Sequence, residues 1–64
     1  MDPNANLQEQ ERIINRAKLG GFVSAVSRNP RLRELRTALS DWLDGSGFAP
    51  DWSKAPNAAR YYGR

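Results

Sequence analysis

The first part of the chain carries apolar residues at helical spacing. On a helical projection, four of them fall on one side: Leu7, Ile13, Ile14 and Ala17. Polar residues occupy the other side, as in a half-buried amphipathic helix. The spacing predicts a helix over residues 6–18. Asp2 or Asn6 is available as its N-cap, because either side chain can accept a hydrogen bond from a free backbone amide.

A second apolar stripe points nearly opposite to the first. Its members are Leu19, Phe22, Val23 and Val26. Gly20 and Gly21 lie where the two stripes meet. One continuous helix would have to bury two opposed faces, whereas a break at the glycines lets each stripe face a common core. We therefore expect a break or sharp bend there, and a short second helix over residues 21–27.

The third stripe follows Asn29 and Pro30. Proline disfavours helix at the residue before it and fits the first turn of a new helix, so Asn29 is predicted to be the N-cap. The expected core residues of this helix, over 30–44, are Leu32, Leu35, Leu39, Trp42 and Leu43. Leu39 is expected at its centre, and Gly45 stands where a left-handed C-cap residue belongs.

After the third helix the apolar spacing ends. Phe48, Pro50 and Trp52 are expected to fold back as an aromatic clasp, with Phe48 and Trp52 in the core. Residues 53–64 show no periodicity, which indicates a basic, mobile tail. Together these features predict an all-α fold. It is a small bundle of two to three short helices in one domain, residues 1–52, followed by the tail.

Composition narrows the possible functions. The 64 residues include no Cys and no His, which excludes disulfides, Cys/His zinc sites, thiol nucleophiles and imidazole catalysis. Phosphate-loop and nucleophile-elbow signatures are absent. We expect no enzyme, no cofactor and no metal, although Asp41, Asp44 and Asp51 could together chelate a cation weakly.

The expected compartment is the cytoplasm. The N-terminal residues are polar, unlike a signal peptide, and no stretch approaches the roughly 20 apolar residues of a membrane-spanning helix. A chain without Cys suits a reducing environment. Because so small a core supplies only about 3–5 kcal/mol, we also expect a partner, and a weak homodimer is one form of it.

Basic residues gather in two places, although the formal net charge is only +3. Arg31, Arg33 and Arg36 crowd the start of the third helix, where the macrodipole disfavours positive charge. A docked phosphate or carboxylate would offset this cost. Alternatively, Arg31 pairs with Glu34 and Arg33 stays solvated.

The second basic cluster lies near the C-terminus, where two tyrosines stand between arginines. Such rings can stack on nucleic-acid bases or contact a protein partner, and a solvated terminus without function is the alternative. The candidate contacts for a partner or an anion are Arg31, Arg33, Arg36, Arg60, Tyr61 and Tyr62.

Two motifs carry a resemblance. The first is Asp2-Pro3-Asn4-Ala5 with Leu7, and the second combines Ala38-Leu39, Trp42-Leu43, Gly47-Phe48, Pro50 and Trp52. In both, the chain resembles uncharacterised short proteins of bacteriophages and actinobacteria, which open with Asp-Pro-Asn-Ala-Thr-Leu and later carry Trp-Leu-x-x-Gly-Gly-Phe and a proline. Asn6 replaces the Thr, Ser46 replaces the first Gly, and the middle of the chain is basic where the group often has an acidic loop. The resemblance implies a phage or phage-derived origin and no particular activity.

These observations favour a small non-enzymatic interaction module, a phage accessory protein that binds or inhibits a larger host or phage protein. The alternative is a nucleic-acid-binding protein, because a tight turn at Asn29-Pro30 followed by an arginine-rich helix resembles helix-turn-helix geometry. Such binding would be mainly phosphate-driven. A virion or assembly component is a further alternative.

Overall fold

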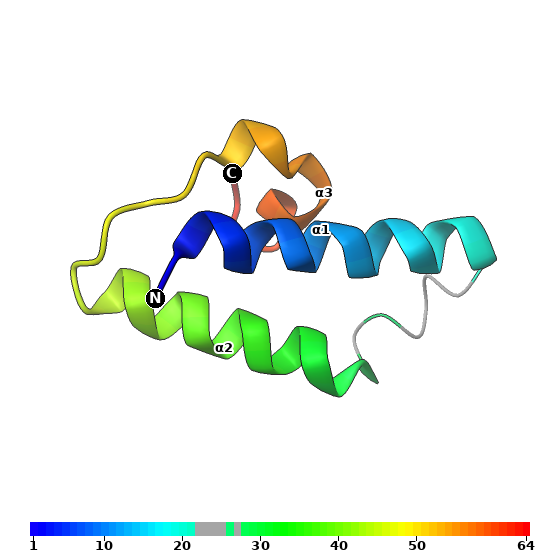
Figure 1. Cartoon of the computed structure of the whole chain (residues 1–64), viewed down its shortest axis with the longest axis horizontal. Helices are drawn as coiled ribbons and strands as arrows, with labels where there is room; N and C mark the ends of the chain where they lie inside the picture. Colours follow the sequence, from blue (N-terminus) through cyan, green and yellow to red (C-terminus); the bar gives the residue numbers. More distant parts are fainter. Residues whose placement is uncertain (22–25, 27) are drawn as a thin grey trace.

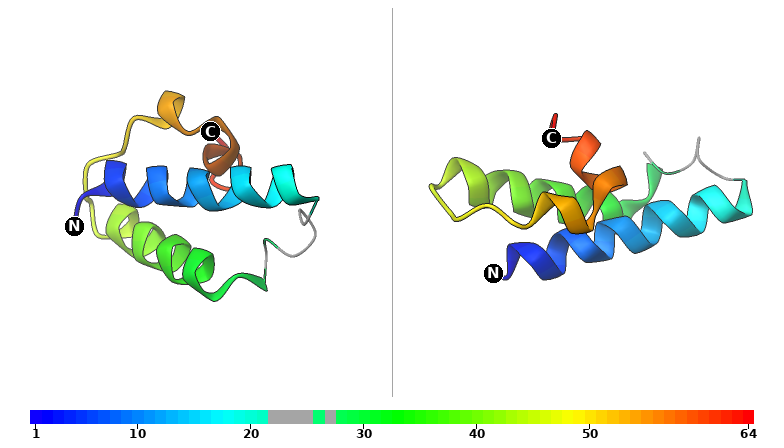
Figure 2. Two further views of the ribbon diagram at one scale, coloured as in Figure 1. Left: turned by 45° about the vertical axis from the view of Figure 1, so that its right-hand side comes forward. Right: turned by 90° about the horizontal axis from the view of Figure 1, so that it is seen from above.

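The computed structural model describes residues 1–21, 26 and 28–64, and confirms the all-α fold. Helices α1 (Pro3–Gly20) and α2 (Pro30–Asp44) lie side by side and run in opposite directions (Figure 1). The chain then passes through a 3₁₀ turn, η2 (Trp52–Lys54), to the short helix α3 (Pro56–Arg60). Figure 2 shows that α3 packs on α1, so α1 contacts both other helices. No helix among the described residues is both long and apolar enough to cross a bilayer.

Helix α1 begins earlier than predicted because Asp2 is its cap. The Asp2 carboxylate accepts hydrogen bonds from the backbone amides of Asn4 at 3.0 Å and Ala5 at 3.2 Å. Pro3 fits the first turn, where its missing N–H has no intrahelical partner to lose. Asn6, the other candidate cap, therefore lies inside the helix and is buried.

The predicted break at the glycine pair is confirmed. Gly21 has φ of +75°, and its N–H donates to the carbonyls of Ala17 and Lys18, which is a left-handed cap that glycine adopts without strain. Leu19 was expected in the core but is 92% exposed. Leu19 still belongs to α1. Its side chain therefore lies on the face of this helix opposite to the first apolar stripe.

The predicted helix over residues 21–27 falls largely on residues 22–25 and 27, which lie outside the described residues. Of its apolar stripe, Phe22 and Val23 belong to that part. Val26 is described, and it packs against the hydrophobic core.

Helix α2 has the predicted bounds and cap. The Asn29 side chain accepts a hydrogen bond from the amide of Leu32 at 2.9 Å. The predicted stripe is confirmed at three of its four leucines, which are buried: Leu32, Leu35 and Leu39. Trp42 and Leu43 are half-buried and pack against this core.

The prediction that Gly45 is the left-handed cap of α2 is wrong by one position. Gly45 has φ of −82°, and Ser46 has φ of +68° instead. The amide of Ser46 donates to the Leu43 carbonyl and that of Gly47 to the Trp42 carbonyl, the pair of bonds that defines a Schellman motif. Glycine is needed one residue later, because a Cβ at position 47 would overlap the Trp42 indole ring.

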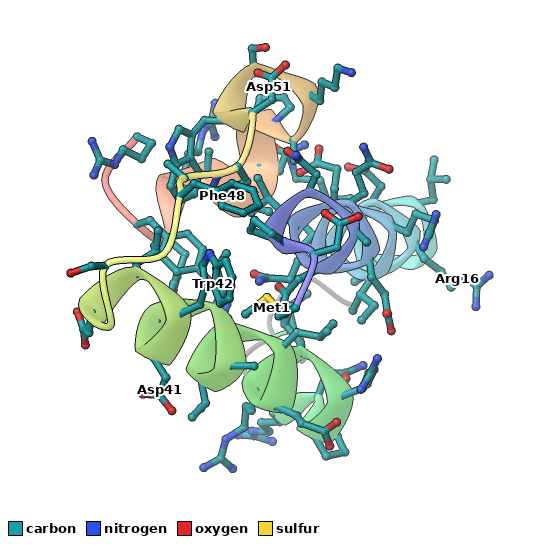
Figure 3. All side chains as sticks on the ribbon, turned by 60° about the vertical axis from the view of Figure 1, so that its left-hand side comes forward. Met1, Arg16, Asp41, Trp42, Phe48 and Asp51 are labelled. Atoms are coloured by element: carbon teal, nitrogen blue, oxygen red, sulfur yellow. The ribbon has the colours of Figure 1, made fainter. Side chains whose placement is uncertain are left out.

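The aromatic clasp also differs from its prediction. The Trp42 indole N–H donates to the Phe48 carbonyl at 2.9 Å, and the two rings meet edge to face with centroids 5.5 Å apart. Phe48 is 63% exposed, so its assignment to the core is wrong. Figure 3 shows Phe48 and Trp42 at the same end of the molecule as Met1. Trp52 is half-buried against Tyr62.

The C-terminal segment is part of the packed structure, in place of the unstructured tail expected after residue 52. Its buried residues are Ala55, Ala58 and Ala59. The Glu11 carboxylate on α1 accepts a hydrogen bond from the Ala58 amide at 2.8 Å. Alanines let the segment approach α1 closely, and their small side chains leave no strong apolar periodicity in the sequence.

A polar network lies inside this packing. Gln10 is completely buried, and its amide nitrogen donates to the Asn6 side chain at 2.7 Å and to the Tyr62 hydroxyl at 3.0 Å. Asn6 in turn donates to the Leu35 carbonyl at 3.1 Å. The network therefore connects α1 to α2 and to the C-terminal segment.

Candidate binding groove

A polar groove on one flank of α2 is the candidate site. Its volume is about 420 Å³, and its lining residues are Arg33, Arg36, Thr37, Ser40, Asp41 and Tyr61. All but Tyr61 come from α2, where their spacing places them beside the buried leucine stripe. Tyr61 follows α3. The groove therefore brings together three of the six predicted contact residues, from segments distant in sequence.

Arg36 is the central cation of the groove. Its guanidinium carbon lies 4.0 Å from the centroid of the Tyr61 ring, within cation–π distance. Its Nε atom is buried without a hydrogen-bond acceptor, and no ion pair joins Arg36 to the other residues that the structure describes. A buried donor left unpartnered costs about 1–3 kcal/mol. The stacked guanidinium is thus an oriented donor for a planar anion.

Arg31, by contrast, is fully engaged in the fold. Its Nε and Nη2 atoms donate to both oxygens of Glu9, at 2.7 and 3.0 Å, and Nη1 donates to Glu34 at 2.6 Å. The hydrogen bond from Arg31 lowers the pKa of Glu9, and the same pair raises the pKa of Arg31. The ion pair between Arg31 and Glu34 is the alternative to an anion site that was considered from the sequence.

The start of α2 offers an anion little free hydrogen-bonding capacity. Pro30 has no N–H, and the amide of Leu32 is bonded to Asn29. Arg33 is exposed, as that alternative expects. The basic residues that remain available on α2 are therefore Arg33 and Arg36, which both line the groove.

The other predicted contacts lie outside the groove. Arg60 is exposed on α3. Tyr62 is half-buried, its hydroxyl is hydrogen-bonded to Gln10, and burial raises the pKa of Tyr62.

A series of aromatic and arginine side chains runs from Tyr61 to Arg64. The centroid of the Tyr62 ring lies 5.1 Å from that of Tyr61 and 5.3 Å from that of Trp52, and the Arg64 guanidinium lies 5.5 Å from the centroid of the Trp52 ring. These groups form a row in which the Tyr61 and Tyr62 rings meet edge to face and the Tyr62 and Trp52 rings are tilted. We call it the arginine–aromatic row: Arg36, Tyr61, Tyr62, Trp52 and Arg64.

A second cavity, of about 590 Å³, lies beside the C-terminal half of α1. Its lining includes apolar Ile13, Ala17 and Val26, with Arg12 and Arg16 among the charged residues. Val26 belongs to the connection between α1 and α2, most of which lies outside the described residues. We assign no binding role to this cavity.

The acidic residues do not form a metal centre in the described part of the chain, where no three metal-ligating side chains come together. Asp51 is used locally: its carboxylate accepts hydrogen bonds from the amide and the hydroxyl of Ser53, which lower its pKa. Asp41 lies in the groove, and Figure 3 shows it projecting from α2 away from α1.

Thr37 and Ser40 were not expected in a site, and Asp41 was considered only as a weak cation ligand with Asp44 and Asp51. The polar spacing of Thr37, Ser40 and Asp41 with Arg33 along one flank of α2 is a signal that could have been used. The contact between Arg36 and Tyr61 left no local signal, because it joins distant segments.

Comparison with known proteins gives no relative: no protein-family model, no curated protein and no solved structure matches this chain. What the structure defines is a small all-α protein with a polar groove on α2. That groove is therefore the basis on which a function can be assigned.

Proposed function

We propose that this chain is a small non-enzymatic interaction module that binds a larger protein through the groove of α2 and Tyr61. The observation that carries the proposal is the state of Arg36. Its guanidinium is held in place by Tyr61, its Nε is buried without an acceptor, and the polar residues Thr37 and Ser40 line the same groove. Arg36 as a whole is half-buried, so the acceptor of a partner would bind the terminal guanidinium nitrogens and not the enclosed Nε.

Composition of the groove supports a protein partner. Tyrosine and arginine are enriched in protein interfaces and among the residues that contribute most to binding. The resemblance to short phage proteins supports the further proposal that the chain is a phage accessory protein. Its target would then be a host or phage protein in the cytoplasm of the host cell.

Nucleic-acid binding is the second candidate, and the arginine–aromatic row favours it, because rings between arginines suit stacked bases and phosphates. Two features count against the helix-turn-helix version. Helices α1 and α2 lie as an antiparallel pair (Figure 1). In addition, the C-terminal turn of α2 carries Asp41 and Asp44, which repel phosphate. A virion or assembly role would use the same groove with another copy or a structural protein as its partner.

The test is a pull-down with the tagged chain from host-cell extract, with half of each sample treated with nuclease. The informative variant is Arg36→Ala. The matched control is Arg28→Ala, which removes the same charge from an exposed residue outside the groove. Circular dichroism of both variants checks that they are folded.

We expect a discrete protein that survives nuclease, is retained by the control variant and is lost with Arg36→Ala. Loss of all captured protein after nuclease would move the assignment to nucleic acid. Equal capture by both variants would show that the groove is not the binding site.

A further inference from the structure

The polar side chains of the groove are not used by the rest of the described fold. Apart from the cation–π contact between Arg36 and Tyr61, none of the six lining side chains forms a hydrogen bond or an ion pair with another described residue. Arg31, by contrast, is paired with Glu9 and Glu34. The groove therefore keeps its hydrogen-bonding capacity for a ligand.

Only one edge of the Arg36 guanidinium is open to such a ligand. A guanidinium can hold a carboxylate in two bidentate ways, through Nε and one Nη, or through both Nη nitrogens. Arg31 uses the first way, with Nε and Nη2 on the two oxygens of Glu9. In Arg36 the Nε is enclosed without an acceptor, whereas neither Nη nitrogen is enclosed in this way. The edge that carries both Nη nitrogens is therefore the one that a ligand reaches.

The charges of the groove favour a monoanion. Arg33 and Arg36 supply two positive charges and Asp41 supplies one negative charge, which leaves a formal charge of +1. A carboxylate carries one negative charge and matches it, whereas a phosphate monoester carries about −1.5 to −2 at pH 7 and is repelled more strongly by Asp41. Thr37 and Ser40 add hydroxyl groups to the lining, and a hydroxyl can donate to a carboxylate oxygen.

We infer that the groove binds a carboxylate group of the partner, held end-on by the two Nη nitrogens of Arg36, and that Asp41 selects a carboxylate over a phosphate. The guanidinium alone does not make this choice, because its planar fork matches both anions. This inference rests on the proposed function, since it names the chemical group that the partner presents. An acidic side chain and the C-terminus of a chain both supply a carboxylate, and peptide probes distinguish these two sources.

The first experiment is an NMR titration of the isotope-labelled full chain at fixed ionic strength. The probes are acetyl-Ser-Glu-Ser-amide, the neutral acetyl-Ser-Gln-Ser-amide, and acetyl-Ser-Gln-Ser with a free C-terminal carboxylate. We expect the glutamate peptide to shift Arg36, Ser40 and Tyr61 and to bind about tenfold more tightly than the neutral peptide, the size expected for hydrogen bonds to a charged group. Tighter binding of the free acid than of the glutamate peptide would support the inference with a chain terminus as the source. Equal affinities for the charged and neutral probes, or shifts elsewhere on the molecule, would overturn it.

The variant Arg36→Lys tests the end-on geometry, because it keeps the positive charge and removes the planar fork. The preference for glutamate over glutamine should fall from about tenfold to about threefold, the size expected for a single exposed ion pair. The matched control is Arg33→Lys, at an exposed arginine of the same groove, which should keep the tenfold preference. Circular dichroism checks that both variants are folded. An undiminished preference in Arg36→Lys would show that charge alone is recognised and would contradict the bidentate arrangement.

A phosphoserine counterpart of the glutamate peptide tests the role of Asp41. At pH 7.5 the parent should bind the glutamate peptide at least as tightly as the phosphoserine peptide. Asp41→Asn should raise the affinity for phosphoserine about threefold relative to glutamate, because the dianion is relieved of more repulsion. The control Asp44→Asn, at an exposed aspartate of α2 outside the groove, should leave this ratio unchanged. A parent that prefers phosphoserine, or a ratio that Asp41→Asn does not change, would contradict the selectivity.

A short oligothymidine completes the set. If it binds more tightly than the glutamate peptide and shifts the same resonances, the occupant is a nucleic acid and the inference is wrong. The pull-down distinguishes this failure from a failure of the proposed function. Nuclease-resistant capture that depends on Arg36, without a preference for the charged over the neutral peptide, would leave the proposed function standing and remove only the carboxylate inference.

Discussion

The Tyr62 hydroxyl offers a direct test of whether the C-terminal segment belongs to the fold. It accepts a hydrogen bond from the amide nitrogen of Gln10 at 3.0 Å and donates to the amide oxygen at 3.3 Å. Gln10 is completely buried. Tyr62→Phe removes this hydroxyl and keeps the ring that packs against Trp52.

The expected loss of stability follows from what Gln10 retains. Its nitrogen keeps the hydrogen bond to Asn6, but its oxygen loses the donor that it has among the described residues. A buried acceptor left without a donor costs about 1–3 kcal/mol. A domain of this size has only about 3–5 kcal/mol available from its core, so Tyr62→Phe should remove a large part of the free energy of unfolding.

Urea unfolding, followed by circular dichroism and tryptophan fluorescence, measures this difference. With a slope of about 1 kcal/mol/M for so small a chain, the midpoint should fall by about 1 M or more. The matched control is Tyr61→Phe, since no hydrogen bond joins that hydroxyl to the residues that the structure describes. Its ring still stacks on Arg36, and its stability should stay within about 0.5 kcal/mol of the parent.

Equal unfolding midpoints for the parent and Tyr62→Phe would refute the reasoning. They would show that the hydroxyl does not serve Gln10, and that residues 53–64 do not pack on α1 as described. The tail expected from the sequence would then be the better description of this segment.

Three further predictions concern the rest of the fold. Leu39→Ala should cost about 2–5 kcal/mol, because Leu39 is completely buried, and the variant should show little cooperative unfolding by circular dichroism. Gly47→Ala should lower the thermal midpoint, at a cost of about 1–3 kcal/mol, since the added methyl overlaps the ring of Trp42; unchanged indole fluorescence would contradict it. The pKa of Glu9 is lowered by Arg31, so its stabilisation is present above the ordinary pKa of about 4.3 and is lost as the pH falls through the lowered value. Glu9→Gln should therefore reduce stability at neutral pH and flatten the acid limb of the pH–stability curve.

Much of the α-helical framework could be predicted from the sequence. Asn29-Pro30 determines the start of α2, because the cap and the proline act within one turn. The spacing of Leu32, Leu35 and Leu39 predicts their burial, and Gly21 ends α1 as expected. The same local reasoning went wrong at Gly45, because the left-handed residue is Ser46 and the glycine that packing requires is Gly47.

The candidate site could be predicted only in part. Arg33, Arg36 and Tyr61 were chosen for their charge and their aromatic character, and the structure places them in one groove. Arg31 was chosen for the same reason, but it is engaged with Glu9. Composition identifies residue types that bind, whereas their availability depends on which partners the fold brings to them.

The sequence by itself determined the existence of the two long helices, the bounds of α2 and which face of α2 is apolar, because capping and periodicity depend on residues within a few positions of each other. Only the tertiary structure decided how the C-terminal segment is used. Small alanines gave it no visible stripe, yet they allow the close approach to α1 that joins Gln10 to Tyr62 across 52 positions. The same return of the chain places Tyr61 on Arg36, and so forms the groove on which the proposed function rests.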